Sequence, residues 1–327
     1  MADSTPCPPT TETSNQMPAR PGLTYLKDKL EWKDFRQSFT VTASNAASSV
    51  NCGGSRNRNT ALRTACVEHL QWLFRYHQNQ RLRESEPKVA ALQKEASQWG
   101  QQIMDMGTDN EPKIHQRVCP QLPRALTIVC HPTLTWLACS PDALDLEGQL
   151  GHEFKTRVTK RVLPTDPSKV DLAHYIQVQM SLHCSRHLPI ARWTLTYELL
   201  GDPRLATFYI NYDEAFCDWL VDVGLKPFND RVQRVCNGFL GDIEQDIHDK
   251  ASYENTFDRA FNRHKYGMMK NPEKKLYELK AQQSLKKSII TYEIIGEIVP
   301  PTMLPLITSL DSEDEEDQPP NKKIKNA

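Results

Sequence analysis

Several stretches of the chain carry apolar residues three or four positions apart, which predicts amphipathic helices. These stretches lie at 30–39, 60–78, 89–106, 171–186 and 213–235, and two further stretches, at 252–269 and 271–288, are predicted to be polar helices. Shorter stretches alternate apolar and polar residues, or are apolar between turn residues, which predicts strands at 125–130, 134–139, 150–157, 192–199 and 205–212. The pattern therefore predicts an α/β fold with a mixed central β-sheet flanked by helices. The first three of these strands are expected to form an antiparallel meander.

Composition divides the chain into four parts. Residues 1–22 are rich in Thr, Ser and Pro without periodicity, which predicts a disordered leader. Residues 23–236 hold the expected sheet and are expected to form the main domain. Residues 237–309 are expected to form a helical or irregular extension. Residues 310–327 are expected to be a disordered tail, since an acidic run there precedes three lysines.

The overall composition excludes few functions. The chain has 327 residues, 39% of them hydrophobic and 25% charged, which is enough for a sizeable core. Its formal net charge is −1, so any contact with nucleic acid would need a local basic patch. No apolar stretch is long and uncharged enough to predict a membrane span.

Cysteine usage and targeting signals bear on the compartment. Nine cysteines are scattered without a Cys-x-x-Cys pair, which indicates a reducing compartment. His183, Cys184 and His187 could suggest zinc, but ordinary helix packing is the preferred interpretation. No secretory signal is found at the start. The basic cluster at 322–325 resembles a nuclear import signal, so we expect a nuclear or otherwise cytoplasmic protein that is not secreted.

One stretch near the middle carries distinctive chemistry. Ser140, Pro141 and Asp142 form a proline-marked turn, and Glu153 and Lys155 follow in a predicted strand. Alternation along a strand puts Glu153 and Lys155 on one face, and the intervening turn can fold Asp142 back towards them. Two carboxylates suit Mg²⁺, and a lysine beside a bound metal can orient or deprotonate a water. The spacing matches the PD-(D/E)xK signature of metal-dependent nucleases.

The same residues have a simpler interpretation. A Glu-x-Lys pair on an exposed strand is often a solvated charge pair, and this stretch could be a surface hairpin. Elsewhere, Thr108 with Glu111 three positions later matches a helix-capping box, in which Glu111 would only cap a new helix after Gly107. Gln177 and Gln179 would by default lie on the surface of their helix.

An anion site is a further hypothesis near the start of the chain. A helix of small residues follows Thr42 and Ser44, and Arg36 lies one element earlier. A helix N-terminus beside an arginine can bind an anion. Plain capping by Thr42 or Ser44 is the alternative.

Taken in order, these features resemble a known family. Their succession is Arg36 with Thr42 to Ser44, Glu111, the Ser140–Asp142 turn, Glu153 to Lys155, and Gln177 with Gln179. It is similar to the lambda-exonuclease-like (YqaJ-type) viral recombinases among the PD-(D/E)xK nucleases, over about residues 32–235. Ala143 departs from the glycine that the family often has after Pro-Asp.

The resemblance implies roles for individual residues. Asp142, Glu153, the Phe154 carbonyl and Glu111 would bind metal, and Lys155 would activate the attacking water. Gln177 would lie next to the lysine. A separate set would hold a 5′-phosphate of DNA, namely Arg36, Ser44 and Ser140. The implied fold is a restriction-endonuclease-like core, and the implied cofactor is Mg²⁺, with Mn²⁺ as a substitute and two ions favoured by the chemistry.

The expected activity is Mg²⁺-dependent hydrolysis of double-stranded DNA, from the 5′ end in the 3′ direction, in viral or mobile-element recombination. The resemblance implies DNA ends as substrate, a single-strand annealing protein as partner, and in some relatives a homo-trimer. Two alternatives stay open. One is a structure-specific endonuclease with the same site, and the other is a nuclear DNA-binding protein whose nuclease fold is degenerate.

Overall fold

The computed structural model describes residues 23–26, 28–53, 57–93, 98–124, 126–158, 162–245, 250–267 and 271–296. The expected leader at 1–22 and the expected tail at 310–327 lie outside these ranges. Within them, no helix is long and apolar enough to cross a bilayer.

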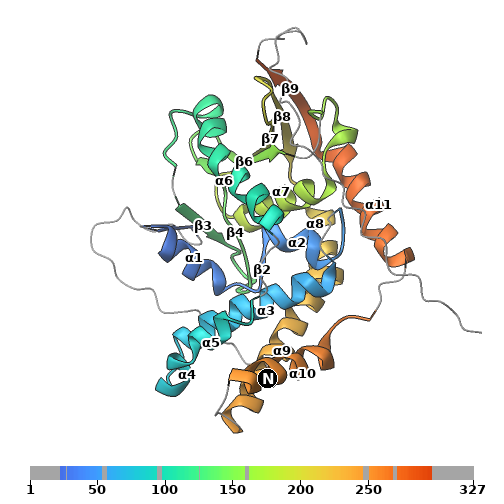
Figure 1. Ribbon diagram of the computed structural model, residues 1–327. Coiled ribbons are helices and arrows are strands. Elements are labelled where there is room, and N and C mark those ends of the chain that lie inside the picture. Colours follow the sequence, from blue (N-terminus) through green and yellow to red (C-terminus); the bar gives the residue numbers. More distant parts are fainter. Residues whose placement is uncertain are drawn as a thin grey trace, which may run out of the picture.

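Two mixed sheets form the centre of the fold (Figure 1). The first has the order β1-β3-β4-β2, with β2 parallel to β4 and the other pairs antiparallel. Its strands are β1 (Leu23–Leu26), β2 (Val41–Thr42), β3 (Leu126–Cys130) and β4 (Leu137–Cys139). The second has the order β5-β6-β7-β8-β9, with only β6 and β7 parallel. Its strands are β5 (Ala143–Asp145), β6 (Leu150–Arg157), β7 (Arg192–Leu199), β8 (Leu205–Asn211) and β9 (Ile289–Ile295).

Helices flank both sheets, so the predicted mixed α/β architecture is confirmed. In the first half of the chain they are α1 (Lys29–Gln37), α2 (Ala43–Ser49), α3 (Arg58–Arg75), α4 (Gln80–Glu84), α5 (Glu86–Ala90) and α6 (Gln98–Val118). In the second half they are α7 (Leu172–Ser185), α8 (Glu214–Leu220), α9 (Lys226–Gln245), α10 (Lys250–His264) and α11 (Asn271–Ser288). A 3-10 turn (Pro167–Lys169) precedes α7, and a π-helical turn (Val221–Leu225) joins α8 to α9.

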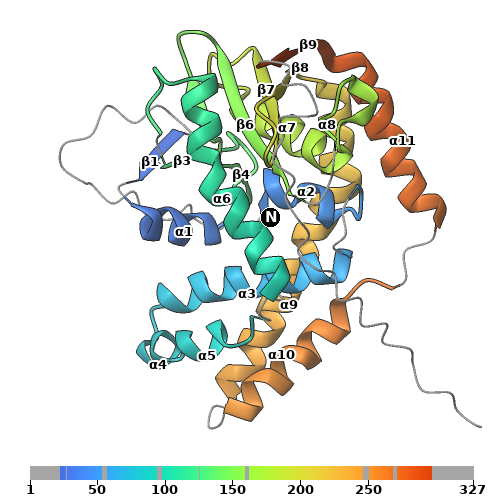
Figure 2. The same ribbon diagram turned by 45° about the horizontal axis from the view of Figure 1, so that its top comes forward.

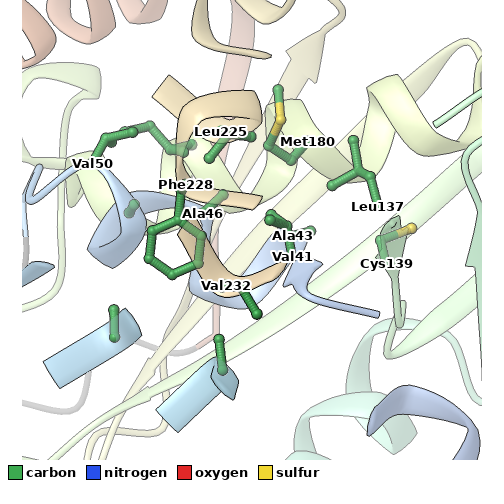
Figure 3. Close-up of a cluster of buried hydrophobic side chains, with 14 of the residues drawn as sticks. Val41, Ala43, Ala46, Val50, Leu137, Cys139, Met180, Leu225, Phe228 and Val232 are labelled. Carbon is green, nitrogen blue, oxygen red and sulfur yellow. The ribbon is translucent and has the colours of Figure 1, made fainter. Parts of the chain in front are cut away.

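The main core lies where α2, β4, α7 and α9 meet (Figure 3). The N-terminal half of α2 has small residues on its buried side, Ala43 and Ala46, and this lets the helix pack closely against α7. Phe228 of α9 and Met180 of α7 fill the remaining space and are fully buried. This packing fixes α7, the helix that carries Gln177, relative to both sheets.

The predicted three-strand meander is wrong. β3 and β4 do pair antiparallel, but β6 belongs to the other sheet, where it lies between β5 and β7. The chain leaves the first sheet after Cys139 and enters the second at Ala143. Pro141 stands between them and has no N–H to continue a ladder. A short strand, β5, then takes the place beside β6 that β4 was expected to occupy.

The predicted break at Gly107 is also wrong. α6 runs without interruption from Gln98 to Val118 and contains both Gly107 and Pro112. Thr108 does not cap a new helix, because its hydroxyl donates to the Met104 carbonyl one turn earlier. Three hydrogen bonds to the second sheet hold the helix in place instead. Asn110 donates to Thr156 of β6 and to Glu198 of β7, and Arg117 donates to Glu198 at 2.8 Å.

The C-terminal part of the described chain adds to the same body. α9 continues past residue 236, where the main domain was expected to end. Tyr253 and Phe257 of α10 and Tyr277 of α11 are buried in the main core. The sequence pattern did not predict β9, which joins the edge of the second sheet next to β8. Figures 1 and 2 show α11 running along the opposite side of the molecule from α6 and leading to β9.

Candidate active site

Asp142 lies where the chain passes from one sheet to the other. Its N–H donates to the His152 carbonyl at 3.1 Å, and its Oδ2 accepts from the Phe154 N–H at 2.5 Å. These two bonds clamp Asp142 against β6, as the sequence predicted for a turn that folds back. One carboxylate oxygen is therefore fixed by the backbone, and the other is not used by these two bonds.

The predicted alternation along β6 holds in the structure. Phe154 is buried with Ile114, Cys119 and Ala143 in a small apolar cluster beneath α6. Glu153, on the opposite face, lies beneath α7 and accepts at Oε1 from Gln177 Nε2 at 2.6 Å. Gly151 shares the face of Glu153, and a Cβ there would come within 2.3 Å of the Trp193 ring, so the tight packing beside Glu153 requires glycine.

Glu153 and Lys155 form a close pair. Lys155 Nζ lies 2.5 Å from Glu153 Oε1, and the side chains are 23% and 3% exposed. The same Oε1 thus receives both Lys155 and Gln177. The other oxygen, Oε2, is buried and has no hydrogen-bond partner. A buried carboxylate oxygen without a partner is costly, which makes it a candidate ligand for a cation.

The charges around Glu153 also favour a bound cation. Burial and then the neighbouring Glu153 raise the pKa of Asp142 well above its usual range, against the opposing effect of Lys155. Burial lowers the pKa of Lys155, but Glu153 and Asp142 raise it by more, so its net pKa is raised and the side chain is an ammonium. The site therefore holds more negative charge than the one lysine offsets.

Glu111 joins this group from α6. Burial, and then Glu153, raise the pKa of Glu111, while Lys155 and Arg124 lower it by less. Arg124 Nη2 lies 3.9 Å from Glu111 Oε2, and the Glu111 side chain is 36% exposed. Glu111 therefore lies in the middle of a continuous helix, and it is close enough to Glu153 and Lys155 for their charges to shift its pKa. The capping role that its spacing suggested is excluded.

The residues fit a hard divalent cation, although their side chains are not gathered into a finished cage. Within the described ranges, no three His, Cys, Asp or Glu side chains lie close enough together to bind an ion as they stand. The donors at hand are carboxylate oxygens, which suit Mg²⁺ or Mn²⁺ rather than zinc. The unpartnered Glu153 Oε2 is the observation that such a cation would explain.

A second polar cluster brings together the three residues of the expected phosphate pocket. Arg36 Nη2 donates to Ser44 Oγ at 2.6 Å and lies 3.5 Å from Thr42 Oγ1. Ser140 Oγ accepts from Trp32 Nε1 at 2.8 Å and donates to the Thr127 carbonyl at 3.0 Å.

Trp32 joins the two halves of this cluster, because the Arg36 guanidinium lies over its ring at 5.3 Å. No role was predicted for Trp32 from the sequence. The signal that could have found it is its position four residues before Arg36, on the same face of α1.

Other polar residues near the site have structural partners. Gln179, fully buried, donates to the Asn211 carbonyl and accepts from the Asp213 N–H, which secures the end of β8. Arg157 donates to Val162 and Lys169 carbonyls and to Asp171, so it secures the segment before α7. Residues 159–161, which include Lys160 and Arg161, lie outside the described residues. Gln177 is thus the glutamine of α7 that faces the carboxylates.

The fold that carries this site is mixed α/β, with two mixed sheets flanked by helices. Among solved structures, the chain is similar to an alkaline exonuclease, LHK-Exo, from Laribacter hongkongensis, with a TM-score of 0.43 and 17% identity over 63% of this chain and 95% of that chain. The structure of LHK-Exo in complex with dAMP gives a TM-score of 0.44 with the same identity and coverage. No family model matches the chain, and no curated protein matches it by sequence. The similarity is one of chain path and assigns no residue a role.

Proposed function

We propose that the protein is a divalent-cation-dependent deoxyribonuclease that hydrolyses phosphodiester bonds of double-stranded DNA, acting as an exonuclease from the 5′ end in the 3′ direction. The observation that carries the proposal is the state of Glu153. Its Oε1 is held by Lys155 and Gln177, and its Oε2 is buried without a partner. A purely structural ion pair would not require a buried carboxylate oxygen without a hydrogen-bond partner. A metal site would require an oxygen that is free to bind the cation.

Four groups would hold the cation. They are Glu153 through Oε2, Asp142 through its second oxygen, the Phe154 carbonyl, and Glu111 directly or through water. Mg²⁺ prefers six oxygen ligands and keeps several waters, so an incomplete protein cage suits it. A bound divalent cation supplies Lewis acidity, which stabilises the charge that builds on phosphate oxygens. A second ion would fit the same chemistry.

The chain's own residues would prepare the attacking water. Lys155 is an ammonium, so it orients a water by donating a hydrogen bond and offsets negative charge on the phosphate. Gln177 keeps Glu153 Oε1 occupied, and this holds the carboxylate in one rotamer. In the reaction, a water oxygen bonds to phosphorus while the 3′ oxygen leaves with the electron pair of the broken bond.

The polarity of digestion follows from the second cluster. Only Pro141 separates Ser140 from Asp142, and two residues span at most about 7 Å. A terminal phosphate held by Arg36, Ser44 and Ser140 would thus leave a nearby phosphodiester beside the carboxylates. Each cleavage gives the shortened strand a new 5′-phosphate, which can occupy the same cluster. Arginine with hydroxyl donors is a common phosphate-binding set.

A comparison of DNA substrates tests the proposal. Linear duplexes with a labelled 5′-phosphate or 5′-hydroxyl, and a closed circle, are incubated with Mg²⁺ or with EDTA. The proposal predicts Mg²⁺-dependent loss of linear DNA, faster with a 5′-phosphate, and an intact circle. Cutting of the circle would indicate the endonuclease alternative. DNA retained without cutting would indicate the non-catalytic binding protein.

Further proposals concern the setting of this activity. An exonuclease of this polarity leaves a 3′ single strand, so a single-strand annealing protein is the proposed partner in viral or mobile-element recombination. A homo-trimer and a nuclear location are proposed on the resemblance and on the basic cluster at 322–325. Size measurement by light scattering and imaging of the tagged chain test these two.

A further inference from the structure

Arg124 differs from the other arginines near the two polar clusters in how its donors are used. Arg36 and Arg117 each donate to a side-chain oxygen, at 2.6 and 2.8 Å, and Arg157 donates to two carbonyls and a carboxylate. Arg124 donates no hydrogen bond to another described residue, and its side chain is 49% exposed. A guanidinium carries five N–H donors. Those of Arg124 are therefore available to a ligand.

The contact that Arg124 does make is a weak one with Glu111. The 3.9 Å between Arg124 Nη2 and Glu111 Oε2 is too long for a hydrogen bond. Both side chains are partly exposed, and ion pairs of this kind contribute little to stability, because water screens the charges and solvates them when they separate. Separating Arg124 from Glu111 would therefore cost little free energy.

The backbone that carries Arg124 is anchored just before it. The Cys119 N–H donates to the His115 carbonyl at 2.8 Å, and the Leu122 N–H donates to the Cys119 carbonyl at 3.0 Å. Leu122 also packs against the apolar cluster that contains Phe154. Arg124 follows two residues later, so its long side chain can change partners while the loop between α6 and β3 keeps its place.

Positive side chains approach Glu111 from three elements. Burial raises the pKa of Glu111, whereas Lys155 of β6, Arg124 of the loop and the exposed Lys29 of α1 lower it. Exposed positive charges beside carboxylates weaken the binding of a cation by the free protein. A cation alone therefore does not explain Arg124 and Lys29. An anionic ligand that shares the site with a cation does, and a phosphodiester is such a ligand.

We propose that Arg124 pairs with Glu111 in the DNA-free protein and moves onto a backbone phosphate of the duplex when DNA binds. The exchange would release Glu111 to the cation at the same time, so DNA and the cation would each raise the affinity for the other. Arginine suits this role because its planar guanidinium can bind a phosphate through two parallel N–H groups. The inference rests on the proposed function, since it takes duplex DNA as the substrate and Glu111 as a cation ligand.

Duplex binding by the full-length protein in EDTA, followed by fluorescence anisotropy over a range of salt concentrations, tests the phosphate contact. Arg124→Ala should weaken binding by about three- to tenfold and reduce the slope of log K against log salt by about one. Arg124→Lys should keep the slope, because it keeps the charge, but recover only part of the affinity. Arg81→Ala, on the exposed helix α4 far from β6 in Figure 1, is the control and should change neither.

Calorimetric titration with Mn²⁺ tests the exchange. It is performed with and without a duplex whose phosphorothioate linkages resist hydrolysis, and Mn²⁺ binding by the duplex alone is subtracted. Without DNA, Arg124→Ala should bind Mn²⁺ more tightly than the wild type, because Glu111 is already released. DNA should raise the Mn²⁺ affinity of the wild type, and Arg124→Ala should lose about threefold or more of this gain. A purely structural role for Arg124 would leave the gain unchanged.

Two results would overturn the inference and leave the proposed function intact. The first is a wild type that cuts duplex DNA while Arg124→Ala keeps the same duplex affinity and salt slope. The second is an equal gain in Mn²⁺ affinity from DNA in the wild type and in Arg124→Ala. A wild type that neither binds nor cuts duplex DNA would overturn the proposed function and this inference with it.

Discussion

The two polar clusters on either side of Pro141 differ in how their groups are satisfied. In the cluster of Asp142, Glu153 and Glu111, carboxylates repel one another and one buried oxygen has no partner. In the cluster of Arg36, Ser44 and Ser140, the side chains hydrogen-bond to one another or to nearby residues. The first cluster would therefore gain stability from an added cation. The second would have to exchange internal hydrogen bonds for those of an anion, which would favour a ligand with a strong, compact charge.

The largest expected effect is on the carboxylate cluster. Asp142→Ala and Glu153→Ala should each lower the rate of DNA hydrolysis by about a thousandfold or more, equivalent to about 4 kcal/mol of barrier. Each would remove a proposed ligand, and Glu153→Ala would also leave Lys155 without its ion-pair partner. The measurement is single-turnover digestion of end-labelled duplex. Glu147→Gln, in the exposed turn between β5 and β6, is the matched control and should keep full activity. Losses below this size would count against the ligand assignment.

A smaller effect is expected in the second cluster. Arg36→Ala should reduce the preference for 5′-phosphorylated over 5′-hydroxyl ends by about ten- to a hundredfold, the value of one or two charge-assisted hydrogen bonds. The rate on 5′-hydroxyl ends should change little, since Arg36 does not contact the carboxylates. Arg81→Ala, on an exposed helix, is the control. An unchanged preference for 5′-phosphorylated ends would show that the cluster does not bind the 5′-phosphate.

The next effect concerns Gln177. Gln177→Ala should slow hydrolysis by about tenfold, because Glu153 Oε1 loses one of its two donors and the carboxylate gains freedom. Gln177→Glu should cost more, since it adds a fourth carboxylate. Cation affinity, measured by titration calorimetry, should fall in parallel with the rate. If the rate falls and affinity for the cation does not, Gln177 acts on the substrate and not through Glu153.

The smallest effect is on stability. Because the pKa of Asp142 is raised in the fold, its ionisation destabilises the metal-free protein; this cost is absent below the ordinary pKa of an unfolded aspartate and grows as pH rises towards the raised pKa. Asp142→Asn should therefore raise the free energy of unfolding in EDTA by about 1–2 kcal/mol, the scale of one close like-charge interaction. Mg²⁺ should stabilise the wild type but not this variant. Calorimetric melting with and without Mg²⁺ measures both.

Much of the fold could be predicted from periodicity, and the errors have physical causes. The helices α3, α7 and α11 and the strands β7 and β8 were predicted within a few residues, whereas the helix predicted at 213–235 ends ten residues before α9 does. The predicted helix was ended at Gly107, which weakens a helix interior, yet α6 continues and hydrogen bonds from Asn110 to Thr156 and Glu198 hold this part of it against the sheet. The partner of β6 was mispredicted because sheet membership depends on long-range pairing. β9 was missed because its residues read as an exposed apolar run.

For the candidate site, sequence spacing predicted the shared face of Glu153 and Lys155 and the return of Asp142, and the structure has both. Spacing could not place Glu111, since its approach to the site depends on how α6 packs over Phe154. Nor could spacing distinguish Gln177 from Gln179, which lie two residues apart. Gln177 donates to the Glu153 carboxylate, whereas Gln179 donates to the Asn211 carbonyl at the end of β8. The catalytic and binding roles of the candidate site residues stay predictions.

The most direct test is to locate a divalent cation in crystals soaked with Mn²⁺, by its anomalous scattering. The account predicts an ion coordinated by Glu153 Oε2, with Asp142 and the Phe154 carbonyl as further ligands, and with Lys155 and Gln177 still on Glu153 Oε1. A saturating soak that leaves Glu153 Oε2 without an ion, or that places Mn²⁺ only at other carboxylates, would contradict it.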